Sequence, residues 1–193
     1  MAGKQKNEFV QLGGVLCAIT LVVALCLGGV NAITVEPIAK QNQLKTENAL
    51  AQVMDAESEV VEVPEGTTAT TDAGTSVDIY AAYKMTKDGE HVGYCVEVGP
   101  TGFGGPVDTM VGISNDGTIT GISVISAAGE TPGLGANSKT PEFQEQFAGQ
   151  PADGTVAVAK DGGSITAITG ATITSRAVSE GVNAAVKFVA ELG

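Results

Sequence analysis

The stretch Ile168-Thr169-Gly170-Ala171-Thr172-Ile173-Thr174-Ser175-Arg176-Ala177-Val178 decides how this 193-residue chain ends, because it passes from a glycine turn into an apolar repeat. The apolar residues that follow have the i, i+4, i+7, i+8 and i+11 spacing of one buried helical face; they are Val178, Val182, Ala185, Val186 and Val189. This spacing predicts a C-terminal amphipathic helix. Thr174 or Ser175 is the expected N-cap, because a hydroxyl oxygen accepts from the free N–H groups of a first turn.

The turn before this helix has the composition of an anion site. Gly170 and Ala171 leave the backbone accessible, and Thr172 presents a hydroxyl near the free N–H groups of the helix start. A phosphate at this point is stabilised by those donors and by the positive end of the helix dipole. Arg176 either adds positive charge or is simply solvated. A plain strand-to-helix turn with capping hydroxyls accounts for the same residues, so both interpretations stay open here.

Two further glycine-rich loops precede this turn in the sequence. One loop is Gly102-Phe103-Gly104-Gly105-Pro106, and the other is Gly129-Glu130-Thr131-Pro132-Gly133-Leu134-Gly135. Glycine lets a backbone approach a flat ligand closely, and Phe103 and Tyr94 are candidate apolar walls for such a ligand. No Gly-x-Gly-x-x-Gly motif follows a strand, so a Rossmann-type nucleotide site is not indicated.

The region around these loops alternates like a sheet. Two predicted hairpins have Asp-Gly turns, which support the positive φ that a tight turn needs; their strands are residues 79–85, 92–98, 109–113 and 118–125. Residues 141–147 fit a short helix with proline in its first turn, and residues 156–159 and 165–168 are two further expected strands. We therefore predict an α+β domain with an antiparallel sheet over residues 77–193.

Residues 9–35 form an uncharged, mainly aliphatic segment. As a helix rising about 1.5 Å per residue, this segment exceeds the ~30 Å hydrocarbon core of a bilayer. Lys4 and Lys6 precede it, whereas Lys40 and Lys45 lie beside acidic residues, so the positive-inside bias is small but present. We predict a cytoplasmic N-terminus and transmembrane helix over residues 1–35, a single span of the cell (inner) membrane, and an extracytoplasmic C-terminal domain.

Two other interpretations of the apolar segment remain. Val30-Asn31-Ala32 resembles a signal-peptide cleavage site, although the apolar run is longer than the usual ~7–15 residues. A pilin-like assembly helix is the second alternative, but it lacks the acidic residue expected shortly after Phe9.

Residues 36–76 are predicted to connect the span to the domain. The apolar residues Ile38, Leu44, Leu50 and Val53 recur at roughly helical spacing, which favours a juxtamembrane amphipathic helix. Residues 55–76 are rich in Glu, Thr, Ala and Gly and are interpreted as an acidic linker.

Composition excludes several functions. A formal charge of −12 argues against nucleic-acid binding, which depends on Lys and Arg. Three cysteines and one histidine do not supply the usual zinc ligand sets, and no hydrolase motif is present. Cys95, in an alternating segment, is expected to be a small buried residue without chemistry.

Four short motifs, in order, make the chain similar to a known family. They are Gly93-Tyr94-Cys95-Val96-Glu97-Val98, Gly104-Gly105-Pro106, Glu130-Thr131-Pro132-Gly133-Leu134-Gly135 and Thr169-Gly170-Ala171-Thr172-Ile173-Thr174. The sequence resembles the FMN-binding domains of the small, single-span subunits of bacterial ion-pumping redox complexes, with the greatest resemblance to the G subunit of the Rnf ferredoxin:NAD oxidoreductase. The C subunit of the sodium-pumping NADH:quinone reductase and a membrane-anchored binding domain without redox chemistry are the alternatives.

The resemblance implies an electron-transfer subunit that works with other membrane subunits. It implies FMN attached through a phosphoester to Thr172 by a flavin transferase that uses FAD. Gly170 and Ala171 then shape the attachment turn, and Thr174 and Ser175 donate near the phosphate. The implied flavin pocket is lined by Glu130, Thr131, Pro132, Gly133, Leu134 and Gly135. No residue is assigned as a general acid or base.

Two positions depart from the family pattern. Thr166 stands where the family often has Asp, six residues before the modified threonine, and Ala128 stands where it often has His. The first difference bears on recognition by the transferase, and the second removes a polar contact to the flavin.

Overall fold

The computed structural model describes residues 2–192, with side chains described for residues 11–192. The side chains of Lys4, Lys6 and Phe9 therefore lie outside the described part. The chain divides into two compact units, Met1–Leu44 and Lys45–Gly193.

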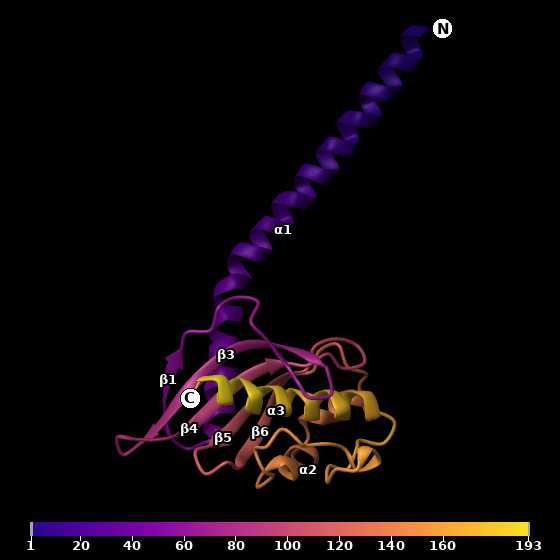
Figure 1. The fold of residues 1–193 in the computed structure, drawn as a ribbon. Helices are drawn as coiled ribbons and strands as arrows, with labels where there is room; N and C mark the ends of the chain where they lie inside the picture. Colours follow the sequence, from indigo (N-terminus) through magenta and orange to yellow (C-terminus); the bar gives the residue numbers. More distant parts are fainter. Residues whose placement is uncertain (1, 193) are drawn as a thin grey trace. The chain divides into compact units, whose positions relative to one another are not determined.

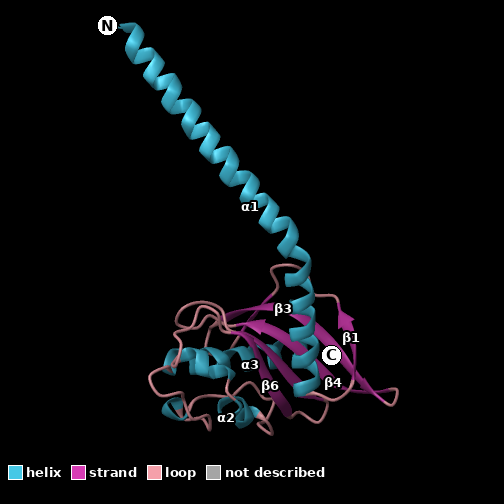
Figure 2. Cartoon of the chain, turned by 180° about the vertical axis from the view of Figure 1, so that it is seen from behind, coloured by secondary structure: helices cyan, strands magenta, loops and turns pink. Residues whose placement is uncertain are grey.

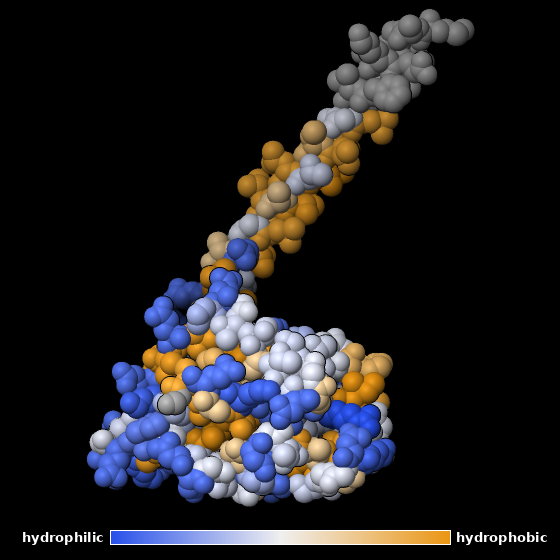
Figure 3. Space-filling model, in the orientation of Figure 1, coloured by the Kyte–Doolittle hydropathy of each residue, from blue (hydrophilic) through white to orange (hydrophobic). Residues whose placement is uncertain are grey.

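The described residues of the first unit, 2–44, are helical and belong to α1, which runs over Ala2–Val53 and continues through Pro37. Within residues 11–35 the side chains are exposed or nearly so and mostly apolar, which Figure 3 shows as a largely orange surface along the helix. Among the described residues, this is the one helix that is long and apolar enough to cross a membrane. An exposed apolar helix of this length is what the predicted span requires.

The second unit is built on an antiparallel sheet (Figure 1). Its strands are β1 (Glu57–Val61), β2 (Thr68–Thr70), β3 (Ser76–Lys87), β4 (Glu90–Gly99), β5 (Asp108–Ser114) and β6 (Ile119–Ser126). The order is β1-β3-β4-β5-β6, and β2 pairs with another part of β3. The β3–β4 turn has positive φ at Asp88 (53°) and Gly89 (83°), and the β5–β6 turn has φ of 80° at Gly117. The two predicted hairpins are therefore confirmed.

The interpretation of residues 55–76 as a linker was wrong. Glu57–Val61 pairs with β3 from Glu57↔Thr86 to Val61↔Ala82, and Thr68–Thr70 pairs with its other end. Four of the five β1 residues are exposed, so this edge strand is held through its backbone and shows no apolar alternation. The sheet consequently begins well before Val77.

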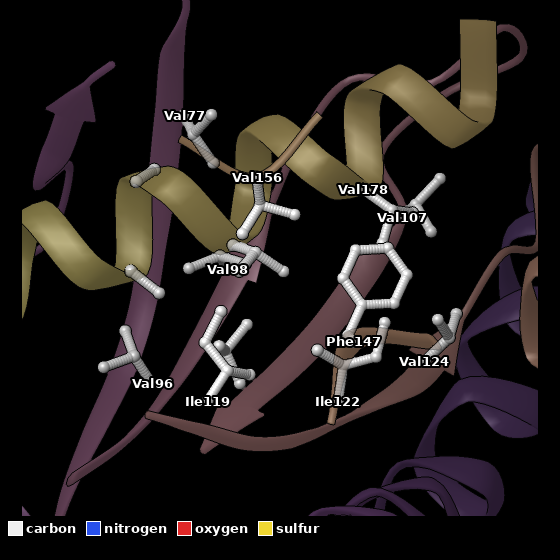
Figure 4. Close-up of a cluster of buried hydrophobic side chains, with 14 of the residues drawn as sticks. Val77, Val96, Val98, Val107, Ile119, Ile122, Val124, Phe147, Val156 and Val178 are labelled. Atoms are coloured by element: carbon white, nitrogen blue, oxygen red, sulfur yellow. The ribbon is translucent and has the colours of Figure 1, made fainter. Parts of the chain in front are cut away.

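The two faces of the sheet are covered by different helices. Helix α3 (Thr172–Leu192) packs on one face, over a core whose members are shown in Figure 4, including Val96, Phe147 and Val178. On the opposite face, seen in Figure 2, residues 45–53 of α1 pack on the sheet and form a second cluster with it. That cluster consists of Ala49, Leu50, Val53, Met85, Cys95 and Met110.

The connection from β6 to α3 is mostly irregular. The expected short helix is present as α2 (Pro141–Gln144) followed by a 3₁₀ turn at Glu145–Phe147. The two strands expected at 156–159 and 165–168 are wrong: only an isolated parallel bridge joins Val158 and Ile165. A 3₁₀ turn at Ala159–Asp161 and the left-handed Gly162 interrupt the extended backbone there, so the two segments do not form a continuous strand pairing.

Candidate functional site

The turn that leads into α3 is held by its own hydrogen bonds. Gly170 has φ of 78°, which allows the Ala171 N–H to donate to the Ile168 carbonyl at 2.9 Å. The Ser175 hydroxyl donates to the Ala171 carbonyl at 2.9 Å and accepts from the Ile168 N–H at 3.0 Å. These bonds fix the first helical residue at Thr172 and the N-cap at Ala171, so the expected N-cap at Thr174 or Ser175 was wrong by three or four residues.

The backbone of this turn presents free donors. The first bond within the helix start runs from the Ser175 N–H to the Ala171 carbonyl at 3.0 Å. The N–H groups of residues 172–174 have no protein acceptor within residues 2–192. Three unpaired N–H groups at the positive end of a 21-residue helix are a suitable anion site.

The hydroxyls of Thr174 and Ser175 are not part of that donor set. Both residues are fully buried, and their hydroxyls donate to Glu130 and to Ala171. The sequence led us to expect that these two hydroxyls donate to a phosphate. In the structure both hydroxyls instead donate to protein acceptors. The backbone N–H groups of residues 172–174 are the donors that remain.

Glu130 connects this turn to the Phe103 loop (residues 100–106). Its Oε1 accepts from the N–H groups of Phe103 at 2.7 Å and Gly104 at 3.2 Å. Its Oε2 accepts from the Thr174 hydroxyl at 2.7 Å. The Glu130 residue is 5% exposed, so the carboxylate exchanges its hydration for these three bonds.

A cavity of about 410 Å³ lies over the turn, within the size range of small-ligand sites. Its polar lining residues include Thr172 and Lys160, whose ammonium lies 3.5 Å from the Thr172 hydroxyl oxygen. Its exposed apolar lining residues include Phe103, which is 70% exposed, and Leu134, which is 41% exposed. The full lining is Phe103, Glu130, Thr131, Leu134, Gly135, Lys160, Gly170, Ala171, Thr172, Ile173 and Thr174.

The structure thus brings together most of the predicted site residues. Pro132 and Gly133 belong to the same loop but do not line the cavity, and Ser175 lies beneath the turn. Tyr94 is not a wall of this cavity: it packs edge-on against His91, with ring centroids 4.7 Å apart, beside a different pocket. Sequence patterns did not identify Lys160, because only the folded path of residues 156–165 places it beside Thr172.

A second hollow of about 360 Å³ adjoins the first across Ile173 but does not contain Thr172. Arg176 at its edge makes a two-pronged ion pair with Asp161, with N–O distances of 2.6 and 2.7 Å. The guanidinium holds the pKa of Asp161 below its usual value. Arg176 is therefore neutralised by a partner, which leaves Lys160 as the cation directed to the Thr172 cavity.

Cys95 has no role in the site. It is fully buried between the sheet and residues 45–53, and burial raises the pKa of its thiol to about 12. A thiol in that state is a poor nucleophile and a packing residue.

Comparison with known proteins first identifies the class of domain that forms the second unit. A family model described as an FMN-binding domain matches residues 102–187, which contain every residue that lines the cavity. In fold, the chain is similar to the crystal structure of the C subunit of the Na⁺-translocating NADH-quinone reductase from Parabacteroides distasonis. The TM-score is 0.54 at 23% identity, covering 79% of this chain and 94% of that one.

Curated relatives then identify the family. The G subunit of the Na⁺-translocating ferredoxin:NAD⁺ oxidoreductase complex of Acetobacterium woodii is 35% identical, covering 94% of this chain and 92% of the relative. The G subunit of the proton-translocating complex of Clostridium ljungdahlii is 32% identical, covering 96% and 94%. The chain belongs to the family of G subunits of ion-translocating oxidoreductase complexes.

Proposed function

We propose that this protein is the FMN-carrying electron-transfer subunit of a membrane-bound, ion-translocating ferredoxin:NAD oxidoreductase of the Rnf type, with FMN joined to Thr172 by a phosphoester. The observation that carries the proposal is the position of the Thr172 hydroxyl. It stands at the first residue of α3, beside three free backbone N–H groups and the Lys160 ammonium, at the edge of a ligand-sized cavity.

The donors around Thr172 fit a phosphate. Backbone N–H groups at a helix start and a lysine ammonium both favour an anion, and the ammonium contributes a charge-assisted bond. The absence of a side chain at Gly170 leaves space beside the cavity. A Cβ on Gly170 would lie 2.9 Å from Leu134 Cδ2, so a larger residue there would press on Leu134, which lines the cavity.

The exposed apolar side chains that line the cavity fit a flat aromatic ring. Phe103, Leu134 and Ile173 are three of the most exposed large apolar side chains of the second unit, with exposures of 70%, 41% and 52%. An isoalloxazine ring against Phe103 and Leu134 would remove this apolar surface from water. When bound, FMN supplies the reversible uptake and release of electrons, while the protein supplies position and electrostatics.

Attachment requires a balanced exchange with FAD. The Thr172 oxygen bonds to the phosphorus of the FMN half, the bond from that phosphorus to the AMP oxygen breaks, and AMP and the hydroxyl proton leave. Thr172 is half-buried and lines the cavity, so a flavin substrate that enters the cavity would reach its hydroxyl. A flavin transferase is the proposed maturation partner, and the other membrane subunits of the complex are the proposed partners in electron transfer.

The proposed location follows from the apolar helix. We assign residues 9–35 to a single membrane span, with the N-terminus cytoplasmic and the second unit extracytoplasmic, on the basis of the lysines at positions 4 and 6. Reaction of a cysteine introduced at the exposed position Ser164 with a membrane-impermeant maleimide, in intact cells, tests this orientation.

Intact mass measurement tests the cofactor. The full chain is expressed with a flavin transferase and purified in detergent. We expect a mass increase of one FMN less one water, and flavin fluorescence that stays with the chain on a denaturing gel. An unmodified chain, from cells that flavinylate a known acceptor protein, would instead support an anchored binding domain without redox chemistry.

A further inference from the structure

The buried carboxylate of Glu130 joins three segments that are distant in the sequence. Its donors come from Phe103 and Gly104, 27 and 26 residues earlier, and from Thr174, 44 residues later. A carboxylate offers about four lone-pair sites, and three are filled by protein donors. Most of the hydrogen-bonding capacity of Glu130 is thus directed to the protein and not to the cavity it borders.

The surrounding glycines indicate how closely these segments meet at Glu130. A Cβ on Gly102 would lie 2.2 Å from Oε1, and a Cβ on Gly135 would lie 1.8 Å from Oε2 and 2.7 Å from the Thr174 hydroxyl. Neither glycine needs its freedom for a positive φ, because neither has one. Their small size is required because the carboxylate occupies the space that a side chain would fill.

The bonds of Glu130 connect two segments that line the cavity. The Phe103 loop supplies the exposed aromatic ring, and the first turn of α3 supplies Thr172. Without Glu130, within residues 2–192, the N–H groups of Phe103 and Gly104 have no other acceptor. The loop would then lose its hydrogen-bonded link, through Glu130, to the first turn of α3.

We propose that Glu130 is a positioning residue that fixes the Phe103 ring relative to Thr172 and, through its negative charge beside the cavity, lowers the reduction potential of the attached flavin. The inference rests on the proposed function above. The carboxylate acts through Phe103 and Thr174 and through its field, without being a ligand of the flavin. Reduction adds negative charge to a flavin, and a nearby anion in a poorly solvated site opposes that addition.

Two substitutions separate geometry from charge. Glu130→Gln keeps a carbonyl oxygen for the Phe103 and Gly104 N–H groups, and its amide can donate to the Thr174 oxygen, so it removes mainly the charge. Glu130→Ala removes both. Glu142→Gln is the matched control, because it makes the same change of charge at an exposed position on α2.

The first measurement uses the full chain in detergent without flavin. Hydrogen exchange of peptides that contain Phe103 and Gly104 is followed by mass spectrometry. We expect exchange at least tenfold faster in Glu130→Ala, and within about threefold of the parent in Glu130→Gln and Glu142→Gln. Unchanged exchange in Glu130→Ala would overturn the positioning role, whether or not the chain carries FMN.

The second measurement uses the flavinylated chain and a redox titration. Glu130→Gln should shift the equilibrium towards reduced flavin by three- to tenfold, or roughly 15–30 mV for a two-electron couple, whereas Glu142→Gln should shift it less than twofold. Equal shifts in the two variants would overturn the electrostatic role.

If Glu130→Ala does not fold, Thr174→Val supplies the geometric test, with Thr174→Ser restoring the parent exchange. Failure of the proposed function is distinguishable, since it would leave no flavin to titrate while the exchange result stands.

Discussion

The hydroxyl of Thr120 donates to the carbonyl oxygen of Val53 at 2.5 Å, which joins the last residue of α1 to strand β6. The last carbonyl groups of a helix have no partner within the helix, so this bond satisfies one of them. Ser123 makes a second link from β6, donating to the Gln52 side chain at 2.7 Å. Residues 45–53 are thus part of the folded second unit, and the sheet depends on them for cover.

Leu50→Ala tests this dependence. Leu50 is 7% exposed and packs in the cluster with Met85 and Met110, so its truncation should cost about 2–4 kcal/mol of stability. Leu44→Ala, at a side chain that is 56% exposed, should change stability by less than about 0.5 kcal/mol. Thermal unfolding in detergent, followed by near-ultraviolet circular dichroism, measures both. Equal effects would mean that the last turns of α1 do not cover the sheet.

Gly135→Ala should weaken flavin attachment. Its Cβ would lie 1.8 Å from Glu130 Oε2, so the carboxylate or the loop has to move. Gly121→Ala is the control, because its Cβ would meet nothing closer than Val53 Cα at 4.0 Å. We expect the flavin content of Gly135→Ala, measured by absorbance per chain, to fall at least severalfold and that of Gly121→Ala to stay at the parent level. Full flavin content in both variants would show that the packing around Glu130 tolerates a methyl group.

Lys160→Met should slow the attachment of FMN. The substitution keeps the length of the side chain and removes the ammonium that lies 3.5 Å from the Thr172 oxygen. A charge-assisted bond to a phosphate contributes about 1.5–3 kcal/mol, so we expect a rate at least tenfold lower at limiting transferase. Lys187→Met, which breaks a distant surface pair with Asp72, serves as the control. A rate equal to that of the parent would remove Lys160 from the site.

Glu97→Gln should stabilise the protein at neutral pH. Burial and the neighbouring Asp108 raise the pKa of Glu97 in the folded state above its usual value. The folded state therefore binds a proton more readily than the unfolded state, and the ionised carboxylate costs stability as the pH rises through the raised pKa. The variant should melt higher at pH 8, by at most about 2–4 °C, and the difference should vanish below pH 4. A difference in melting temperature between the variant and the parent that grows as the pH falls would contradict a raised pKa of Glu97.

The local parts of the fold were predictable from sequence. The hairpins follow from turn residues such as Asp88, Gly89 and Gly117, and α3 follows from a five-residue apolar repeat. Strand β1 was missed because an exposed edge strand pairs through its backbone and needs no alternating side chains. The start of α3 was misplaced because hydroxyls that suit an N-cap instead bond to Glu130 and Ala171.

The site was predictable where its residues are contiguous. The turn at 168–172 and the loop at 129–135 each carry their chemistry in one short stretch, and the fold brings both to one cavity. The contacts between segments were not predictable, because the 44-residue separation of Glu130 and Thr174 is closed only by the packing of α3 on the sheet. Lys160 was missed for the same reason.

The most direct test of the central claim is peptide mapping of the flavinylated chain, with Thr172→Ser and Thr172→Ala compared to the parent. We predict one FMN on the peptide containing residue 172 in the parent and in Thr172→Ser, and none in Thr172→Ala. The alanine variant should still fold, because Thr172 makes no buried hydrogen bond and loses at most about 1 kcal/mol. Covalent flavin at full level in Thr172→Ala, or flavin mapped to another residue of the parent, would contradict the account.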